Sequence, residues 1–362
     1  MKCNIIFVIL FVILLPRMEK INELYSLSST ASRITIVVHT HPDGDALGSG
    51  LALVGYLRER LGKDSVMVVP DSVPDSLCFI MRGFPENVVI EYTGDPLAAL
   101  GRISSSDLLF CLDCPNFSRT NPEMESALRS SKAPKVLIDH HLNPDSDSFS
   151  IVFSKIEISS ASELLFSILK VMPDVDGDLY RLPKNCLEAL MTGLTTDTNN
   201  FANSVFPGTL TMASELLAAG VDRDRILSDL YNQYRENRVR LMGYLLKDNL
   251  EISPDGAAMM TLSKEVQERF DFQQGEAEGF VNIPLAVADV KISIFLTQED
   301  KWFRVSIRSK RGVSANHLAM KYFHGGGHEM AAGGRLYFPE DIPSPEAAKA
   351  YILKVTKEFF SE

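Results

Sequence analysis

The chain has 362 residues, enough for two domains of ordinary size, and 45% of them are hydrophobic and 23% charged. This composition is typical of a soluble globular protein and excludes a largely disordered chain or a polytopic membrane protein. The net charge of −11 argues against a broad grip on long duplex nucleic acid, so an anionic substrate would need a local cationic site. The five cysteines are too few and too irregular for a disulfide scaffold, which favours a reducing compartment.

The amino terminus carries an apolar run, Ile5 to Leu15, that follows Lys2. The run resembles the core of a secretory signal, but it is too short to span a bilayer and no small-x-small cleavage site follows it. We therefore expect residues 1–17 to be a misassigned start or a dispensable extension and the protein to be cytoplasmic, with export as the alternative.

Short runs rich in Val, Ile, Leu and Phe predict buried strands that alternate with helices. The clearest helix is Ala46–Leu61, whose apolar residues recur at helical spacing. The alternation predicts an α/β domain with a mainly parallel sheet flanked by helices, in which ligands bind beyond the carboxyl ends of the strands. The strands are expected at Ile34–His39, Val66–Val69, Val88–Tyr92, Leu108–Asp113 and Val136–Asp139.

The rest of the chain changes from helical to β-rich. Helices are expected at Ala161–Val171, Lys184–Leu194 and Leu210–Ala219, followed by a long polar helical segment, Asp222–Leu250. Strands are then expected at Ala257–Leu262, Val290–Leu296, Trp302–Ile307 and Gly334–Phe338. We therefore predict a first domain over residues 18–235, a helical linker over residues 236–250 and a smaller α+β domain over residues 251–362.

Side chains that can bind metals follow the ends of several predicted strands. Because the carboxyl ends of parallel strands lie at one edge of a sheet, these side chains are expected to converge on a polynuclear cation site. Carboxylates outnumber imidazoles, which favours hard divalent cations. We therefore expect the site to hold two divalent cations, with Mn²⁺ preferred and Mg²⁺ or Co²⁺ as alternatives. Two such cations roughly 3.5 to 4 Å apart can hold a bridging hydroxide that attacks a phosphoryl group. The side chains are His39, Asp43, Asp45, Asp113, Asp139, His140, His141 and Asp197.

Each of these residues also has a purely structural interpretation. Asp43 and Asp45 could be turn residues and a helix N-cap, and Asp113 could cap a turn. Cys111 and Cys114 form a C-x-x-C pair, although the acid inside it disfavours redox chemistry. The two adjacent histidines are harder to explain, because a buried strand end gains nothing from two titratable rings. Together, the structural interpretations become improbable.

The chain resembles the DHH phosphoesterase superfamily, and within it the two-domain enzymes that end in a DHHA1 domain. This group includes NrnA-type oligoribonucleases that also dephosphorylate 3′-phosphoadenosine 5′-phosphate, called pAp. The resemblance covers nearly everything from Ile34 to Phe338. It rests on HTHPDGDALGS from His39, LDCPNFSRT from Leu112, IDHH from Ile138, GLTTDTNNF from Gly193 and GGGHEMAAGG from Gly325.

The resemblance implies roles for the predicted site residues. One cation would be held by His39, Asp43 and Asp113, and the other by Asp45, Asp113, His140 and Asp197, with Asp113 as the bridge. His141 would face the substrate phosphate, and Asp139 would orient the neighbouring histidine. The position of His41 is often Asn in the family, so phosphate contact and loop packing both stay open. Arg119 is either a phosphate contact or an exposed loop residue.

The second domain offers a candidate site for the rest of the substrate. Strand FRVSIRS ends in Arg308 and Ser309, and Lys310 and Arg311 follow. These residues would form the cationic pocket that the acidic chain otherwise lacks. Gly325, Gly326, Gly327 and His328 would let backbone amides approach an anion, and helix formers resume shortly afterwards. In this order, the residues resemble the DHHA1 signature that binds a terminal nucleotide. The single tryptophan, Trp302, is expected to pack within a strand.

We therefore predict a manganese-dependent phosphoesterase that acts on short oligoribonucleotides, the linear dinucleotide pApA, or pAp. An inorganic pyrophosphatase or exopolyphosphatase on the same metal core is the enzymatic alternative, and a non-catalytic nucleotide sensor is the alternative outside enzymes. No membrane or long duplex nucleic acid is expected as a partner. The family resemblance makes a homodimer reasonable.

Overall fold

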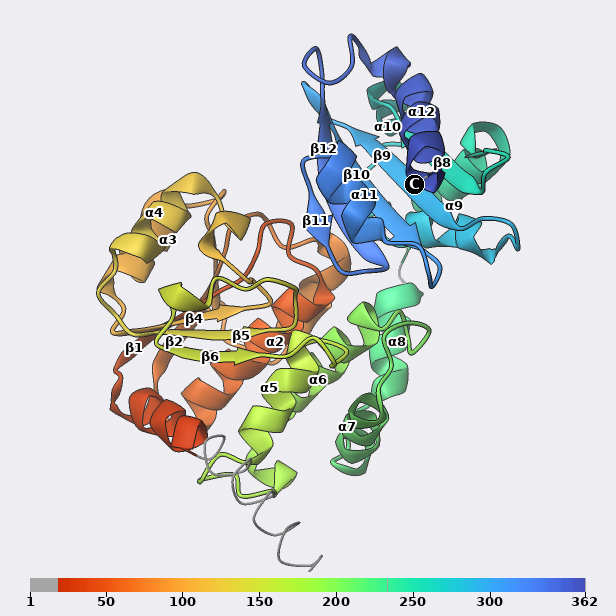
Figure 1. Cartoon of the computed structure of the whole chain (residues 1–362). Helices are drawn as coiled ribbons and strands as arrows, with labels where there is room; N and C mark the ends of the chain where they lie inside the picture. Colours follow the sequence, from red (N-terminus) through yellow and green to blue (C-terminus); the bar gives the residue numbers. More distant parts are fainter. Residues whose placement is uncertain (1–18, 233, 362) are drawn as a thin grey trace, which may run out of the picture. The chain divides into compact units, whose positions relative to one another are not determined.

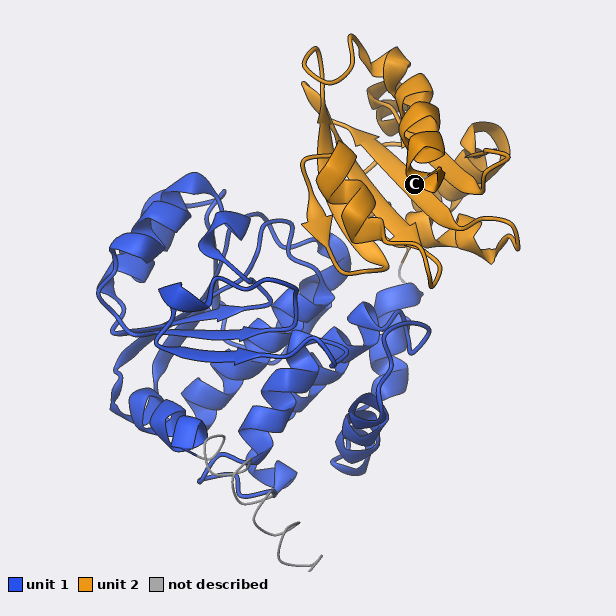
Figure 2. Cartoon of the chain, viewed as in Figure 1, with its two compact units in different colours: residues 1–232 blue, residues 233–362 orange. Residues whose placement is uncertain are grey.

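The computed structural model describes residues 19–232 and 234–361, so the apolar extension predicted over residues 1–17 lies outside the described residues. The chain divides into two compact units, Met1–Asn232 and Gln233–Glu362 (Figure 2). Among the described residues, every helix is too short or too polar to cross a bilayer.

The first unit contains a six-stranded parallel sheet with the strand order β3-β2-β1-β4-β5-β6 (Figure 1). The five predicted strands are confirmed. The sixth, β6, was missed because its short sequence IVFS lies at the edge of the sheet, where only Ile151 is fully buried. The strands are β1 (Arg33–Val37), β2 (Asp64–Val69), β3 (Val89–Glu91), β4 (Leu108–Leu112), β5 (Lys135–Asp139) and β6 (Ile151–Ser154).

Helices cover both faces of this sheet, which explains why its strands read as continuous apolar runs. On one face, Ile36 and Phe110 pack in a large cluster with α2, α5 and α6. On the other face, Val37 and Leu109 pack against α3 and α4. The helices are residues 19–30, α2 (Gly44–Gly55), α3 (Pro96–Ser105), α4 (Pro122–Ser130), α5 (Ala161–Lys170), α6 (Lys184–Asp197), α7 (Pro207–Ala218) and α8 (Arg223–Tyr231). A π-helical turn, Tyr56–Arg60, extends α2.

The second unit contains a six-stranded mixed sheet with the order β11-β12-β10-β9-β8-β7, in which only the pairing of β8 with β9 is parallel. The strands are β7 (Glu251–Ile252), β8 (Ala257–Leu262), β9 (Ile292–Gln298), β10 (Trp302–Ser309), β11 (Gly326–Gly327) and β12 (Ala331–Tyr337). The helices are α9 (Glu236–Tyr244), α10 (Lys264–Arg269), α11 (Ala315–Tyr322) and α12 (Ala348–Phe360), with shorter helical segments at Leu245–Asn249, Phe280–Ala286 and Pro345–Ala347.

The two faces of the second sheet differ in how they are covered. On one face, Phe303, Val305 and Ile307 of β10 pack in a cluster with α11 and α12. On the other face, α9 and the 3₁₀ segment Phe280–Ala286 bury an apolar cluster that includes β8 and Phe295 of β9. The side chains of β10 alternate strictly between half-buried and buried, so the half-buried set belongs to this second face.

Two local predictions in this part of the chain are wrong. The helical segment predicted over Asp222–Leu250 is interrupted, because α8 ends at Tyr231 and the backbone is extended at Arg235 before α9. The glycine run at residues 325–327 is followed by strand β12 rather than by a helix, since Gly326 and Gly327 pair with β12 as an edge strand. Residues 236–250, expected to link the domains, bury Leu241 and Leu245 in the second unit.

Candidate metal centre

Asp113 lies at the centre of the predicted cluster. It follows β4 with a φ of 51°, a left-handed conformation that is unusual for a residue other than glycine and is often found at functional sites. Its Oδ2 lies 3.4 Å from Nε2 of His39, and its Oδ1 lies 3.3 Å from Nε2 of His140. Oδ1 is buried and, among the described residues, accepts no hydrogen bond of good geometry. The two oxygens of one carboxylate therefore face two different ligand groups.

The first group consists of His39, Asp43 and Asp113, whose ligand atoms all lie within 4.8 Å of one another. Nδ1 of His39 donates to the carbonyl of Thr40 at 2.7 Å, because a carbonyl can only accept, and this leaves Nε2 as the ring nitrogen that faces Asp113. Oδ1 of Asp43 accepts from two backbone amides in the first turn of α2, both at 3.0 Å. Asp43 is therefore the N-cap of α2, and the same Oδ1 lies 4.0 Å from Nε2 of His39.

The second group consists of Asp45, Asp113 and His140, again within 4.8 Å. Asp197, the last residue of α6, brings Oδ2 to 3.5 Å from Nε2 of His140. The carboxylate of Asp45 accepts from two backbone amides at the start of α5, at 2.6 and 2.9 Å. The amino end of α5 thus supplies partial positive charge to a fully buried acid.

Close packing of α2, α5 and α6 positions the second group. A Cβ on Gly193 of α6 would lie 2.0 Å from Oγ of Ser162 and 2.8 Å from Oδ1 of Asp45. A Cβ on Gly48 of α2 would lie 2.6 Å from the carbonyl of Ala189. Only glycine permits this approach of the helices. Sequence reasoning missed these positioning residues, and the small residues of ALGSG and MTGLT were the only available signal.

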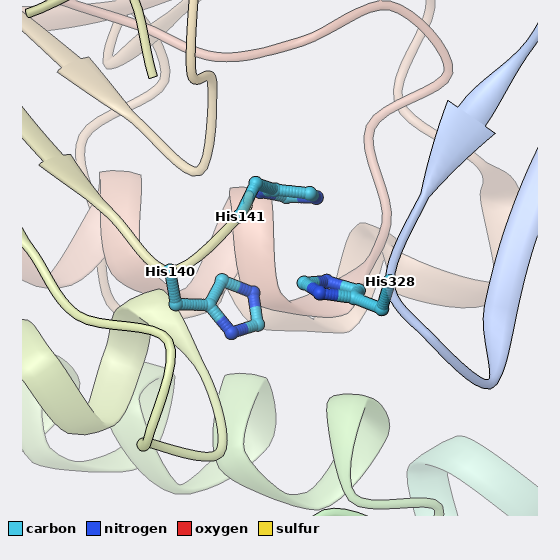
Figure 3. A group of neighbouring side chains, drawn as sticks. All are labelled: His140, His141 and His328. Carbon is cyan, nitrogen blue, oxygen red and sulfur yellow. The ribbon is translucent and has the colours of Figure 1, made fainter. Parts of the chain in front are cut away.

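The two histidines that follow β5 differ in their contacts. Figure 3 shows the rings of His140 and His141 projecting from the segment that follows the strand, with their centroids 5.0 Å apart. Asp139 accepts from the backbone amide of His141 at 2.8 Å and contacts its Nδ1 at 3.0 Å. Asp139 therefore orients the ring of His141 through Nδ1.

The titration behaviour of the cluster reflects crowded carboxylates. Burial alone would lower the pKa of His39, but the hydrogen bond to Asp113 and the nearby acids raise it to about 9. Burial and the charges of Asp43 and Asp113 raise the pKa of Asp197 to about 7. Burial, with the same kind of repulsion, raises the pKa of Asp45 well above its usual value. Without metal, bound protons reduce the repulsion between the carboxylates of the cluster. Bound cations would reduce the same repulsion, so these residues fit a cation site.

His41 and Arg119 border the cluster. His41 is exposed with a φ of 54°, and its amide donates to Oδ2 of Asp71 at 2.6 Å. The carbonyl of Arg119 accepts from the amide of Thr40 at 2.8 Å, and the charge of its exposed guanidinium lowers the pKa of His39. Both residues therefore support the loop that carries His39. Sequence reasoning missed Asp71, which follows β2 in an ordinary-looking turn.

The C-x-x-C pair shows no sign of redox function. Cys111 and Cys114 are both buried and free. Burial raises the pKa of Cys111 to about 12 and raises that of Cys114 as well, so neither thiol forms a reactive thiolate near neutral pH.

The predicted residues of the second unit lie around β10 and β12. Arg308 is half-buried at the end of β10, and its guanidinium donates to the carbonyl of Ile307 at 3.0 Å. The buried hydroxyl of Ser309 donates to the carbonyl of Val313 at 2.6 Å, so it supports the turn that follows β10.

The glycine loop of the second unit lies against β12. A Cβ on Gly325 would lie 1.9 Å from the carbonyl of Gly333, and Gly327 has a φ of 146°, so both positions require glycine. The amide of His328, in the same loop, donates to the carbonyl of Ala331 at 2.7 Å.

Comparisons with known proteins agree with this arrangement. Residues 33–194 match the family model described as "DHH family, N-terminal domain", and residues 258–361 match the "DHHA1 domain". The "Bifunctional oligoribonuclease and PAP phosphatase NrnA" of Bacillus subtilis is 29% identical over 84% of this chain and 90% of its own length. The protein of the same name from Thermus thermophilus is 30% identical over 86% of each chain.

A more distant relative and a solved structure extend the comparison. The "Cyclic-di-AMP phosphodiesterase PdeA" of Listeria monocytogenes is 26% identical over 91% of this chain and 48% of its own length. A crystal structure of an exopolyphosphatase-related protein from Bacteroides fragilis has a TM-score of 0.84 and 34% identity, covering 95% of this chain and 97% of that one. From its domain matches and these relatives, the chain belongs to the DHH family and carries a DHHA1 domain.

Proposed function

We propose that the protein is a metal-dependent phosphoesterase that hydrolyses short oligoribonucleotides, pApA and pAp. The observation that carries the proposal is the carboxylate of Asp113, whose two oxygens face separate groups of acids and imidazoles. Shared carboxylates of this kind hold cation pairs in enzymes that transfer phosphoryl groups. The relatives named as oligoribonucleases and PAP phosphatases support the substrate class.

The ligand sets follow from the two groups. We assign His39, Asp43 and Asp113 to one cation, and Asp45, Asp113, His140 and Asp197 to the other. Their oxygen and imidazole donors suit Mn²⁺, with Mg²⁺ or Co²⁺ as alternatives. When bound, the cations would supply Lewis-acid charge to a phosphoryl group and lower the pKa of a coordinated water.

The chain's own residues would bind and orient the substrate. His141, held by Asp139, would direct Nε2 towards the phosphate and stabilise its charge in the transition state. Asp139 is a positioning residue, because it acts through the ring of His141. We further assign phosphate contacts to His41 and Arg119, both exposed beside the cluster.

The second unit would hold the terminal nucleotide. We assign this role to Arg308, to the backbone of Gly325, Gly326 and Gly327, and to His328. Ser309 would act by holding the turn beside Arg308, since its hydroxyl is already engaged.

The test is product release from pApA, pAp and pyrophosphate with Mn²⁺, Mg²⁺ or Co²⁺. Wild type should release mononucleotide or phosphate from the two nucleotides, and Asp113→Ala should lose at least about a thousandfold, as expected when charge stabilisation at the reacting centre is removed. Asp300→Ala is the matched control, because Asp300 is 94% exposed in a loop of the second unit. Equal, negligible rates for wild type and Asp113→Ala would instead indicate a nucleotide sensor.

Pyrophosphate hydrolysis is the second candidate function. It is favoured by the likeness to a solved structure described as exopolyphosphatase-related. The same substrate panel decides between the two functions, because pyrophosphate turnover well above that of pApA would overturn the proposed substrate class.

A further inference from the structure

One face of the second sheet carries arginine and aromatic side chains on β10 and β12. It is the face on which α9 and the 3₁₀ segment Phe280–Ala286 bury an apolar cluster with β8 and β9. Trp302, Arg304, Ser306 and Arg308 occupy the half-buried positions of β10. Residues directly opposite each other on paired strands project to the same face. The register of β10 with β12 therefore adds two more side chains, since Tyr337 lies opposite Trp302 and Arg335 lies opposite Arg304. We name this set the arginine–aromatic face: Trp302, Arg304, Ser306, Arg308, Arg335 and Tyr337.

The charge of this face is opposite to that of the whole chain. The strands β9, β10 and β12 read ISIFLTQ, WFRVSIRS and AAGGRLY, so they contain three arginines and no carboxylate. The chain as a whole has a net charge of −11. A cationic strip in so acidic a protein is complementary to a polyanion.

The aromatic side chains of the face lie beside each other and beside an arginine. The guanidinium of Arg335 lies 4.8 Å from the ring centroid of Trp302, and the rings of Trp302 and Tyr337 lie 6.5 Å apart. Trp302 is half-buried and, as far as the described residues go, belongs to none of the apolar clusters. The tryptophan lies within a strand as expected, and its neighbours on β12 are Tyr337 and Arg335.

The middle of the arginine–aromatic face carries only small residues. Ser306 lies opposite Gly333, between the levels of Arg304 and Arg308. At the usual rise per residue, Trp302 and Arg308 are about 20 Å apart along the strand, which exceeds the reach of a single nucleotide. A polymer could lie along the strand with its backbone near the small residues.

We propose that the arginine–aromatic face binds the part of a single-stranded RNA that extends beyond its terminal nucleotide. Bases would stack on Trp302 and Tyr337, and phosphates would contact Arg304 and Arg335. Stacking requires unpaired bases, and three arginines are too few for a duplex, so the face favours single strands. The inference rests on the proposed oligoribonuclease function. It predicts that the affinity of the protein for RNA increases with the length of the RNA.

The kinetic test compares a dinucleotide with a pentanucleotide under Mn²⁺. Trp302→Ala should raise KM about tenfold for the pentanucleotide, because the stacking of one base is lost. The KM for the dinucleotide should stay within about twofold, because the dinucleotide does not reach Trp302. Trp302→Phe should restore most of the loss by keeping a stacking ring. Arg335→Gln should raise KM for the pentanucleotide and weaken its salt dependence. An equal effect on both lengths, or none on either, overturns the proposal.

Lys354→Gln is the charge-matched control. Lys354 lies on α12, the helix that covers the opposite face, and its side chain is 72% exposed. It should change neither KM, and unchanged turnover of the dinucleotide in every variant confirms correct folding. A loss for Lys354→Gln equal to that for Arg335→Gln would show that net charge, rather than this face, binds RNA.

Direct binding separates this inference from the proposed function. Because Trp302 is the only tryptophan of the chain, its fluorescence reports on this face without a label. In the full chain with EDTA to prevent turnover, the pentanucleotide should quench the emission and the dinucleotide should not. Quenching without hydrolysis of any oligonucleotide under Mn²⁺ would refute the proposed function alone, whereas hydrolysis of the pentanucleotide without quenching would refute the arginine–aromatic face alone.

Discussion

Replacing Gly193 by alanine tests how the second ligand group is positioned. The new Cβ would lie 2.0 Å from Oγ of Ser162, where real Cβ contacts are almost never closer than 3.0 Å. Either Ser162 or a helix must therefore move by at least about 1 Å, and overpacking of this size costs about 1–3 kcal/mol. The same Cβ would lie 2.8 Å from Oδ1 of Asp45, so the displaced group includes a proposed ligand.

The expected consequence is weaker binding of one cation out of two. Asp45 is held by the amides of Ala161 and Ser162, and loss of such outer support lowers metal affinity by about 10–100-fold. The first group, around His39, should be unaffected. Titration of the metal-free protein with Mn²⁺, followed by calorimetry or electron paramagnetic resonance, should show one unchanged and one weakened site. Turnover should fall with occupancy of the weakened site.

Two further variants make this prediction decisive. Gly101→Ala is the matched control, since Gly101 also lies within a helix but a Cβ there meets nothing within 4 Å. It should stabilise the protein by about 0.5–1 kcal/mol and leave both sites intact. Adding Ser162→Ala to Gly193→Ala removes the closest clash and should recover part of the affinity. Two wild-type Mn²⁺ sites in Gly193→Ala alone would refute the packing argument.

Three other predictions follow from the same geometry. The pKa values of His39 and Asp197 are raised to about 9 and about 7, so their protonated forms stabilise the metal-free fold at low pH. Its melting temperature in EDTA should therefore fall as pH rises from about 4 to 9, and Mn²⁺ should flatten this dependence by displacing the protons. Asp139→Asn should lower kcat about 10–100-fold with unchanged metal content, because it loosens His141; reduced metal binding would refute that role. Cys78 is exposed whereas Cys111, Cys114 and Cys186 are buried, so Cys78→Ser should remove one accessible thiol from the folded protein, as measured with a thiol reagent.

The sequence alone determined the elements that bring the predicted site residues together. Apolar runs buried on both faces located β1, β4 and β5, and parallel strands must bring their carboxyl ends to one edge. That rule alone predicts the convergence of His39, Asp113 and His140, which the distances confirm. Such inferences succeed because the periodicity of a segment records whether its own side chains are buried.

Only the tertiary structure decided which neighbours those side chains have. Nothing local in the sequence shows that the amides starting α5 hold Asp45, or that Gly193 sets the distance between the helices. Likewise, the alternation of β10 predicts two faces but cannot say which elements cover each face, so the half-buried position of Trp302 could not be predicted. Burial by a distant segment depends on packing between elements far apart in the chain, and a single sequence contains no direct record of those contacts.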